Sequence, residues 1–136
     1  MDFNSSIDIA YSGMSAQQQR LKVIAENLAN ADSTSKTPGG DPYRRQLVTF
    51  SDVFDRTLGA SKVKVAGVVP VAGNFGKRYE PSHPAADSDG YVLTPNVNPI
   101  TELLDMREAQ RSYDANLNVI DAVKAMVSRT IDLLHG

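Results

Sequence analysis

Histidines and paired carboxylates are the residues of this chain best suited to catalysis or metal binding. Histidines are sparse, whereas paired carboxylates are frequent but have the spacing of solvated helix faces. The two histidines, His83 and His135, lie far apart in the sequence, and the chain contains no cysteine. Zinc sites need three or four His, Cys or carboxylate ligands at short, recurring spacings. We therefore expect no metal site, and we expect His83 to make local hydrogen bonds in a turn.

Asp87 and Asp89 begin a segment that resembles the first half of a calcium-binding loop. The positions of the later ligands hold Leu93 and Pro95, and no glutamate closes the loop at its twelfth position. We expect a plain turn that leads into a strand. The alternative is an enzyme with an unrecognised carboxylate site at these two aspartates, which would require a concave, partly buried acidic pair.

Other catalytic signatures are also absent. Gly39 and Gly40 are not followed by the Lys-Ser or Lys-Thr of a phosphate-binding loop, and the nucleophile motif Gly-X-Ser-X-Gly does not occur. The sequence predicts no catalytic residue, no cofactor-binding residue and no metal ligand, and we expect the protein not to be an enzyme.

Three asparagines are better placed to contact protein than to do chemistry. Asn27, Asn30 and Asn116 fall within or beside helical patterns, although asparagine is a mediocre helix former. Polar residues beside a helix seam can fix the register between paired helices. For Asn30, a position at the C-terminal end of a helix is an equally good explanation.

The charge composition does not predict a nucleic-acid-binding protein, because a surface that binds nucleic acid needs clustered Lys and Arg. The 136 residues include 14 Lys and Arg against 16 Asp and Glu, which gives a net charge of −2. The one small basic cluster consists of Tyr43, Arg44 and Arg45. We weigh a lateral contact with a neighbouring molecule against an ordinary solvated surface for these three residues.

Membrane insertion and secretion through a cleaved leader are not expected either. No apolar run approaches the ~20 residues of a membrane span, and the N-terminus lacks the basic start and apolar core of a secretory signal. A chain of this kind would leave the cytoplasm by another route.

Residues 5–31 carry apolar residues at seven-residue intervals, which predicts a long amphipathic helix. Ser5 and Asp8 resemble a capping pair for this helix. Gly13 lies inside the pattern, where glycine costs about 1 kcal/mol relative to alanine. Close approach of another backbone and a local weak point explain this glycine equally well.

The same spacing recurs from residue 99 to the C-terminus. Asn98 is a good N-cap and Pro99 a good first helical residue, and no further proline or glycine occurs before His135. As one helix, residues 99–136 would extend roughly 54 Å, whereas a compact chain of this size has a diameter of roughly 37 Å.

The middle of the chain has a different pattern. Residues 32–42 are turn formers and predict a loop. Short alternating segments between 43 and 98, separated by glycine and proline, predict a small antiparallel sheet with few strands. We also expect Ser51 to cap a short helical turn that continues to Leu58.

We therefore expect an elongated α+β fold whose long N- and C-terminal helices pack as an antiparallel, coiled-coil-like layer. Val119, Met126 and Leu133 form a further apolar row that one antiparallel helix cannot cover, so partners from other chains are needed. We expect the ends of these helices to be partly disordered in the isolated chain and to become ordered when the chain assembles with its partners. The expected packing residues are Ile7, Met14, Leu21, Ile24, Asn27, Leu28, Asn30, Met106, Tyr113, Asn116, Leu117, Ile120, Val123, Val127, Ile131 and Leu134.

Several ordered motifs resemble the bacterial flagellar axial proteins, the family that forms the rod and the hook. Ser-Gly-Met-Ser-Ala-Gln at 12–17 and Asn-Leu-Ala-Asn-Ala-Asp at 27–32 resemble the N-terminal signature of this family. The continuation is similar to the proximal-rod members and lies in residues 34–45, 79–87 and 90–92 and at positions within 95–126. Pro99 departs from the family pattern, and residues 60–78 match it only loosely.

The resemblance implies a structural subunit of the proximal rod, the shaft that joins the membrane ring of the motor to the hook. It implies helical assembly that transmits motor torque and forms the wall of the export channel. Its implied partners are further copies of the chain, the rod proteins FlgB, FlgF and FlgG, the adaptor FliE, the flagellar type III export apparatus and, indirectly, the membrane ring. It implies a rod location spanning the periplasm, export without a cleavable signal peptide, and neither a nucleic acid nor a small-molecule substrate.

On this basis we divide the chain into four segments. Residues 1–31 and 99–136 would form an inner helical layer, 32–61 a linker with lateral contacts, and 62–98 a small outer β element. The alternative is a soluble helical adapter that pairs with a single unrelated partner, forming a defined complex and no polymer.

Overall fold

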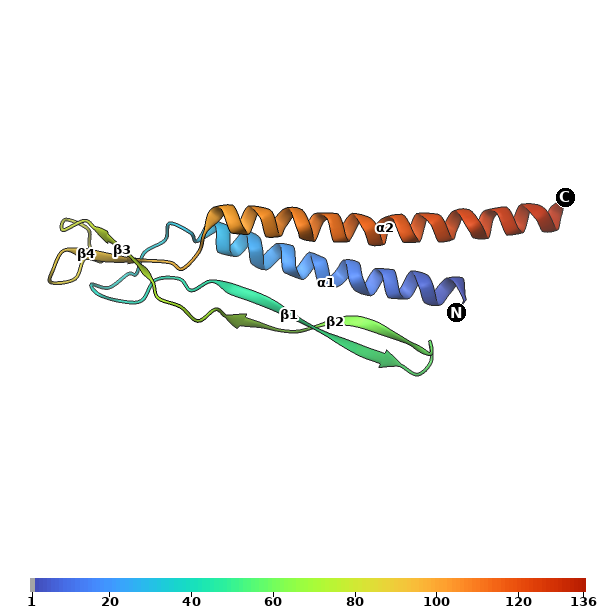
Figure 1. Ribbon diagram of the computed structural model, residues 1–136, viewed down its shortest axis with the longest axis horizontal. Coiled ribbons are helices and arrows are strands. Elements are labelled where there is room, and N and C mark those ends of the chain that lie inside the picture. The colour runs from blue at the N-terminus through green and yellow to red at the C-terminus, as the bar shows by residue number, and fades with distance from the viewer. Residues whose placement is uncertain (1) are drawn as a thin grey trace. The chain divides into compact units, whose positions relative to one another are not determined.

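The computed structural model describes residues 2–136 and contains two long helices with four strands between them (Figure 1). In chain order the elements are α1 (Phe3–Ala29), β1 (Gln46–Asp55), β2 (Ala60–Pro70), β3 (Gly76–Tyr79), β4 (Tyr91–Thr94) and α2 (Pro99–His135). The strands form two separate two-stranded sheets, β1 with β2 and β3 with β4. The α+β class expected from the sequence is confirmed.

Helix α1 is capped by a residue that the sequence analysis did not select. The Asp2 carboxylate Oδ1 accepts hydrogen bonds from the backbone N and the Oγ of Ser5, both at 2.7 Å. These bonds lower the pKa of Asp2 below its usual value of 3.8. The expected pairing of Ser5 with Asp8 was wrong, because the helix begins at Phe3 and Ser5 occupies its first turn.

Helix α2 starts as the sequence predicts. Asn98 Oδ1 accepts hydrogen bonds from the backbone N of Ile100 at 3.0 Å and of Thr101 at 3.4 Å, and Pro99 is the first helical residue. The helix then runs for 37 residues without interruption, which corresponds to roughly 55 Å.

Strand β1 replaces the helical turn expected after Ser51. The chain stays extended to Asp55, where it turns back into β2. Asp55 Oδ1 accepts hydrogen bonds from the backbone N of Thr57 at 2.9 Å and of Leu58 at 3.3 Å, and Gly59 supplies a positive φ of 63°. The expected helical turn from Ser51 to Leu58 was wrong, because pairing with β2 stabilises the extended form of the residues up to Asp55, and the chain turns only between Asp55 and Ala60.

Strands β3 and β4 are antiparallel, with Gly76 opposite Thr94 and Tyr79 opposite Tyr91. The two tyrosine rings meet edge to face, with their centroids 5.2 Å apart. Gly90 has a φ of 84°, and a Cβ at this position would lie 2.9 Å from the Tyr79 ring. A glycine is thus required where the turn brings the backbone against this ring.

The turn between β3 and β4 contains the histidine and aspartates considered above. His83 Nδ1 accepts a hydrogen bond from the backbone N of Ala85 at 3.0 Å. Asp87 Oδ1 accepts from the backbone N of Asp89 and of Tyr91, both at 2.9 Å. The predictions of a local role for His83 and of a plain turn before a strand are confirmed.

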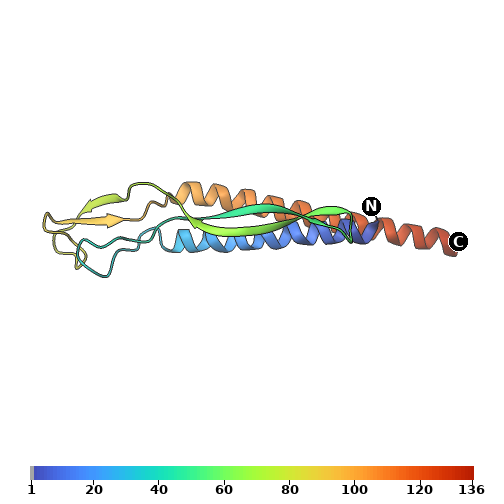
Figure 2. The same ribbon diagram turned by 90° about the horizontal axis from the view of Figure 1, so that it is seen from below.

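The chain folds into two compact units, each built from segments of both halves of the chain. The first unit comprises Met1–Leu21, Val48–Gly67 and Arg107–Gly136, and the second comprises Lys22–Leu47 and Val68–Met106. In the first unit, β1 and β2 lie beside α1 in both views (Figures 1 and 2). The backbone N of Val63 in β2 donates a hydrogen bond to Ser12 Oγ of α1 at 3.2 Å. Among residues 2–136, neither helix has a stretch long and apolar enough to cross a bilayer.

Candidate functional site: helix seam, polar cluster and open apolar faces

In the first unit, α1 and α2 pack against each other in antiparallel directions. Arg20 Nη2 lies 3.2 Å from Glu108 Oε2, and Gly13 lies against the side chain of Asn116. Because positions rise along α1 as their partners fall along α2, the helices run in opposite directions. A Cβ added to Gly13 would lie 2.8 Å from Asn116 Nδ2. The structure therefore shows a close contact at this glycine, but the neighbour is the Asn116 side chain and not the backbone of another segment, which one of the two explanations expected.

The apolar core of the first unit is small. It consists of Ala10, Met14 and Ile120, with Tyr113 packed against it, and Ile120 is only 1% exposed. Asn116 lies next to this core and donates a hydrogen bond from Nδ2 to the Ser112 carbonyl oxygen at 3.0 Å. Its polar end is thus satisfied within its own helix while its side chain contacts α1.

The structure distributes the expected packing residues over all levels of burial. Buried are Met14, Ile24, Asn27, Ile120 and Val123. Partly buried are Ile7, Leu21, Leu28, Asn30, Met106, Tyr113, Asn116 and Val127. Exposed are Leu117, Ile131 and Leu134. Asn30 Nδ2 donates to the Glu26 carbonyl oxygen at 2.8 Å, which fits a position just after the helix rather than one that fixes register.

The second unit contains a polar cluster, defined here as Asn27, Tyr43, Arg45, Gln46 and Glu102. Asn27 Nδ2 donates to the Gln46 carbonyl oxygen at 2.8 Å and to Glu102 Oε2 at 3.1 Å. Asn27 Oδ1 accepts from the Tyr43 hydroxyl at 2.8 Å and from the Gln46 backbone N at 2.9 Å. Asn27 is completely buried and all four of its hydrogen-bonding positions are used.

The charge in this polar cluster is a carboxylate with no exposed surface. Glu102 is 0% exposed, and its Oε1 accepts a hydrogen bond from Arg45 Nε. Arg45 Nη2 also pairs with Asp105 Oδ2 at 2.9 Å, and the Arg45 backbone N donates to Asn96 Oδ1 at 2.8 Å. A buried carboxylate is stable only with such compensation. Arg45 therefore ties the segment that enters β1 to the first turns of α2.

Tyr43 completes the polar cluster and its ionisation is perturbed. Burial raises the pKa of Tyr43 above its usual value of 10.0, and the nearby carboxylates Glu26 and Glu102 raise it further. The neutral hydroxyl is the form that donates to Asn27, so the environment favours the form that the hydrogen bond needs.

Arg44 is also engaged within the second unit. Its Nη1 donates to the carbonyl oxygens of Val71 at 3.0 Å and Gly73 at 2.9 Å, and its guanidinium lies 4.3 Å from the ring centre of Phe75. All three residues of the basic cluster thus make defined contacts inside the chain. The lateral contact expected of Tyr43, Arg44 and Arg45 stays a prediction.

Glu102, Gln46 and Asn96 are the polar residues that sequence reasoning missed. The sequence analysis noted Asn27 as a register-fixing residue but named no partner for it. Its partner Glu102 is 75 positions away, and Arg45 lies 57 positions from the same glutamate. The only signal was an acidic residue in the first turn of an amphipathic helix, which is ordinarily explained by the helix dipole.

Large apolar side chains remain exposed on α2 and the hairpin of the first unit. On α2 the exposed fractions rise from 45% for Val119 and 47% for Met126 to 83% for Leu133 and 80% for Leu134. An open groove of about 320 Å³ lies between the two helices and is lined by Phe3, Ile7, Val127 and Ile131, among others. Since α1 begins at this groove, the final turn of α2 has no α1 residue opposite it (Figure 1).

No group of three or more His, Cys, Asp or Glu side chains suitable for a metal ion occurs within the part of the chain that the structure describes. The groups of the polar cluster compensate one another through their hydrogen bonds and ion pairs.

Comparison with known proteins gives matches over nearly the entire chain. Residues 7–35 match the family described as "Flagella basal body rod protein", and residues 88–133 match "Flagellar basal body rod FlgEFG protein C-terminal". The flagellar basal-body rod protein FlgC of Agrobacterium fabrum is 52% identical over 94% of this chain and 92% of its own length. The chain belongs to the FlgC family.

More distant FlgC proteins match over a similar extent. The protein of Escherichia coli O157:H7 is 44% identical over 93% of both chains, and that of Bacillus subtilis is 33% identical over 94% of this chain and 95% of its own. This FlgC-family chain is a structural subunit of the flagellar basal-body rod and assembles with other rod components. The two matched segments cover most of α1 and α2, whereas the β1–β2 hairpin lies between them.

Proposed function

We propose that this chain forms part of the proximal rod, where it assembles helically with copies of itself and with other rod proteins. In this role it transmits motor torque to the hook and contributes to the wall of the export channel, without catalysis. The observation that carries the proposal is the exposed apolar end of α2, where Leu133 and Leu134 are 83% and 80% exposed.

Burial of these side chains by neighbours would favour assembly. Each fully buried leucine contributes about 1.5–3 kcal/mol, and contiguous exposed apolar surface marks an interaction site. Contacts between unlike surfaces that do not close on themselves generate helical arrays. A rod built in this way would pass torque through many apolar contacts at once, rather than through one specialised residue.

The segment assignment follows the same proposal. Residues 1–31 and 99–136 would form the inner axial layer, 32–61 a linker with lateral contacts through Tyr43, Arg44 and Arg45, and 62–98 an outer β element. The proposed neighbours are FlgB, FlgF, FlgG and the adaptor FliE, with the membrane ring contacted indirectly. Export through the flagellar type III apparatus without cleavage would bring the chain to the periplasm-spanning rod.

Substitution of the exposed leucines tests the proposal. We expect a strain that produces only the Leu133→Asp, Leu134→Asp double variant to lack rods in electron micrographs of purified basal bodies and to be non-motile. Because both side chains are solvent-exposed, the purified variant should melt at the same temperature as the parent. Gln110→Glu is the matched control, since it adds negative charge at another exposed position of α2.

Normal rods in the leucine variant would overturn the assignment of the α2 end as an assembly surface. The helical adapter hypothesis makes a different prediction, namely a complex of fixed stoichiometry with one partner and no polymer. The comparisons with FlgC proteins do not favour it. Intact mass of the subunit in purified basal bodies would test export without cleavage.

A further inference from the structure

We propose that the tip of the β1–β2 hairpin docks on an acidic stripe of α2 in a second copy of this chain. The hairpin tip is defined here by Val53, Phe54, Arg56 and Lys64, and the acidic stripe by Asp114, Leu117 and Asp121. This inference rests on the proposed function, because it assigns one contact between neighbouring copies in the rod.

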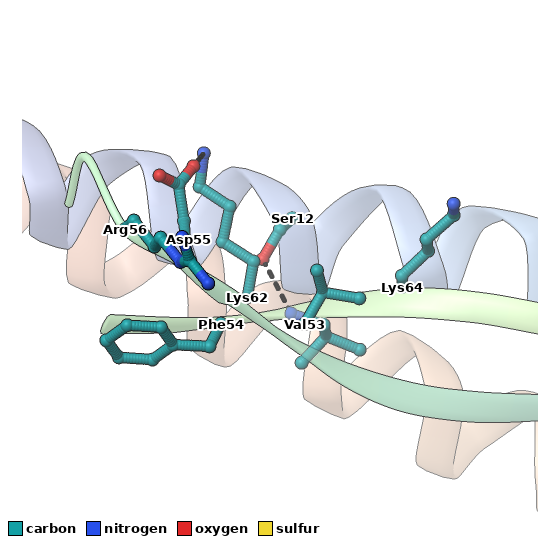
Figure 3. Close-up of a pocket in the computed structure, with 8 residues that line it drawn as sticks. Ser12, Val53, Phe54, Asp55, Arg56, Lys62 and Lys64 are labelled. Atoms are coloured by element: carbon teal, nitrogen blue, oxygen red, sulfur yellow. Dashed lines mark hydrogen bonds and ion pairs between the residues drawn. The ribbon is translucent and has the colours of Figure 1, made fainter. Parts of the chain in front are cut away.

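The hairpin tip borders an open pocket of about 470 Å³ between the hairpin and α1 of the first unit (Figure 3). Apolar side chains line it and remain accessible, since Val53 is 45%, Phe54 62% and Val63 42% exposed. Such an apolar surface on a two-stranded hairpin is unusual for a free molecule, because a hairpin of this size ordinarily needs further packing for stability.

Three basic side chains and one carboxylate line this pocket together with its apolar residues. Lys62 is neutralised by Asp55, whose Oδ2 lies 3.1 Å from Lys62 Nζ. Arg56 and Lys64 also line the pocket, are exposed, and form no ion pair within the described residues. An occupant should therefore present two negative charges that flank an apolar side chain.

The acidic stripe on α2 has this composition. Asp114, Leu117 and Asp121 are spaced at i, i+3 and i+7, so they lie on one helix face. All three are exposed, Leu117 to 40%, and neither aspartate forms an ion pair among residues 2–136. The stripe thus offers two unpaired carboxylates with a leucine between them.

The arrangement of the charges is complementary on the two surfaces. Arg56 follows the last residue of β1 and Lys64 lies in β2, so the two basic side chains come from the two arms of the hairpin and line one pocket together with its apolar residues. Asp114 and Asp121 are two helical turns apart, or roughly 10.5 Å along the axis, with Leu117 between them. The proposed contact pairs each basic side chain with one aspartate around the Leu117 side chain.

A second copy is the occupant that the chain itself indicates, because both complementary surfaces occur on one sequence. Each copy would offer its hairpin tip to one neighbour and its acidic stripe to another. Such a contact joins unlike surfaces and propagates along an array instead of closing a dimer. Charge complementarity of this kind also fixes the register between neighbours.

A charge exchange tests the contact in cells that produce only the variant chain. We expect Arg56→Glu with Lys64→Glu to lose rods in purified basal bodies, and Asp114→Lys with Asp121→Lys to lose them as well. The chain that carries all four substitutions should regain rods, because the charges are complementary again. All four positions are exposed, so circular dichroism of each purified variant should show parental helicity and melting temperature.

Disulfide trapping identifies the neighbour. The chain lacks cysteine, so when one tagged copy carries Val53→Cys and a differently tagged copy carries Leu117→Cys, a disulfide-linked pair of copies that carries both tags must join position 53 of one copy to position 117 of the other. In basal bodies from cells producing both, we expect a band at twice the subunit mass that carries both tags. A Tyr79→Cys copy, in place of the Leu117→Cys copy, is the control for random collision, because Tyr79 is 64% exposed but lies outside the acidic stripe.

The inference is overturned if the fourfold variant fails to regain rods, if either double variant assembles normally, or if the trapped band is no stronger than in the Tyr79 control. If the pocket at the hairpin tip binds another rod protein instead, the Arg56→Glu, Lys64→Glu variant should lose rods and the Asp114→Lys, Asp121→Lys variant should keep them. Failure of the proposed function is distinguishable, because cells without the chain would then retain complete rods.

Discussion

At the scale of single residues, Gly13 is the position where side-chain size is most restricted. A Cβ there would meet the Asn116 side chain at 2.8–3.1 Å, and Asn116 is held by its bond to the Ser112 carbonyl oxygen. We expect Gly13→Leu to destabilise the isolated protein by about 1–3 kcal/mol, the typical cost of overpacking. Gln18→Leu adds a similar side chain at an exposed position of α1 and should change stability little. Thermal unfolding followed by circular dichroism compares the two, and equal melting temperatures would contradict the close approach.

The raised pKa of Tyr43 predicts how the free energy of unfolding changes at alkaline pH. Its folded-state pKa is raised above 10.0 by burial and by Glu26 and Glu102. The folded protein therefore retains this proton where the unfolded chain loses it, so the stabilisation is complete below pH 10 and declines as pH rises above it. We expect Tyr43→Phe to flatten the alkaline part of the stability curve in urea titrations. Tyr11→Phe, at a half-exposed position, is the control. The prediction fails if both variants show the same alkaline slope.

At the scale of elements, the polar cluster joins α1, the start of β1 and α2 within the second unit. Arg45→Ala would leave Glu102 as a buried charge without its guanidinium partner, and we expect a loss of about 3–5 kcal/mol. Arg20→Ala breaks a more exposed pair with Glu108 and should cost about 0–1 kcal/mol. Chemical denaturation measures both. Comparable losses in the two variants would mean that Glu102 does not depend on Arg45.

A double variant separates the charge from the packing in this polar cluster. Glu102→Gln with Arg45→Met removes both charges while keeping side-chain volume similar. It should be more stable than Arg45→Ala, because no buried charge is left without compensation. If the double variant were as unstable as Arg45→Ala, packing of the Arg45 side chain would be the dominant contribution.

Sequence predicted the helices well because their signals are local. Seven-residue periodicity and the Asn98–Pro99 cap depend on neighbours within a few turns, and the structure places α2 accordingly. The spacing of Ser51, Val53 and Leu58 was also compatible with a helical turn, and only pairing with β2 decides for a strand. The polar cluster depends on pairs separated by 57 and 75 positions, so residue types alone singled out Asn27 but not its partners.

At the scale of the whole molecule, the described chain buries few large apolar side chains. The buried apolar residues other than alanine are Met14, Val23, Ile24, Val92, Ile120 and Val123. Small cores give marginal stability to a chain on its own. Leu133 and Leu134 add little to intramolecular packing because both are largely exposed. Association that covers the exposed leucines therefore stabilises the folded chain by apolar burial that the isolated chain lacks.

This balance predicts that order at the end of α2 depends on assembly. Backbone hydrogen bonds over residues 126–135 are flanked mainly by exposed side chains in the isolated chain, so their local opening should cost little free energy. We expect amide hydrogen exchange there to be fast in dilute purified protein and slow in purified basal bodies. Residues 113–120, next to the Ile120 core, are the internal reference and should be protected in both. Full protection of 126–135 in the dilute chain would mean that the helix is stable on its own, and the apolar end would then contribute to assembly only through contact and not through ordering.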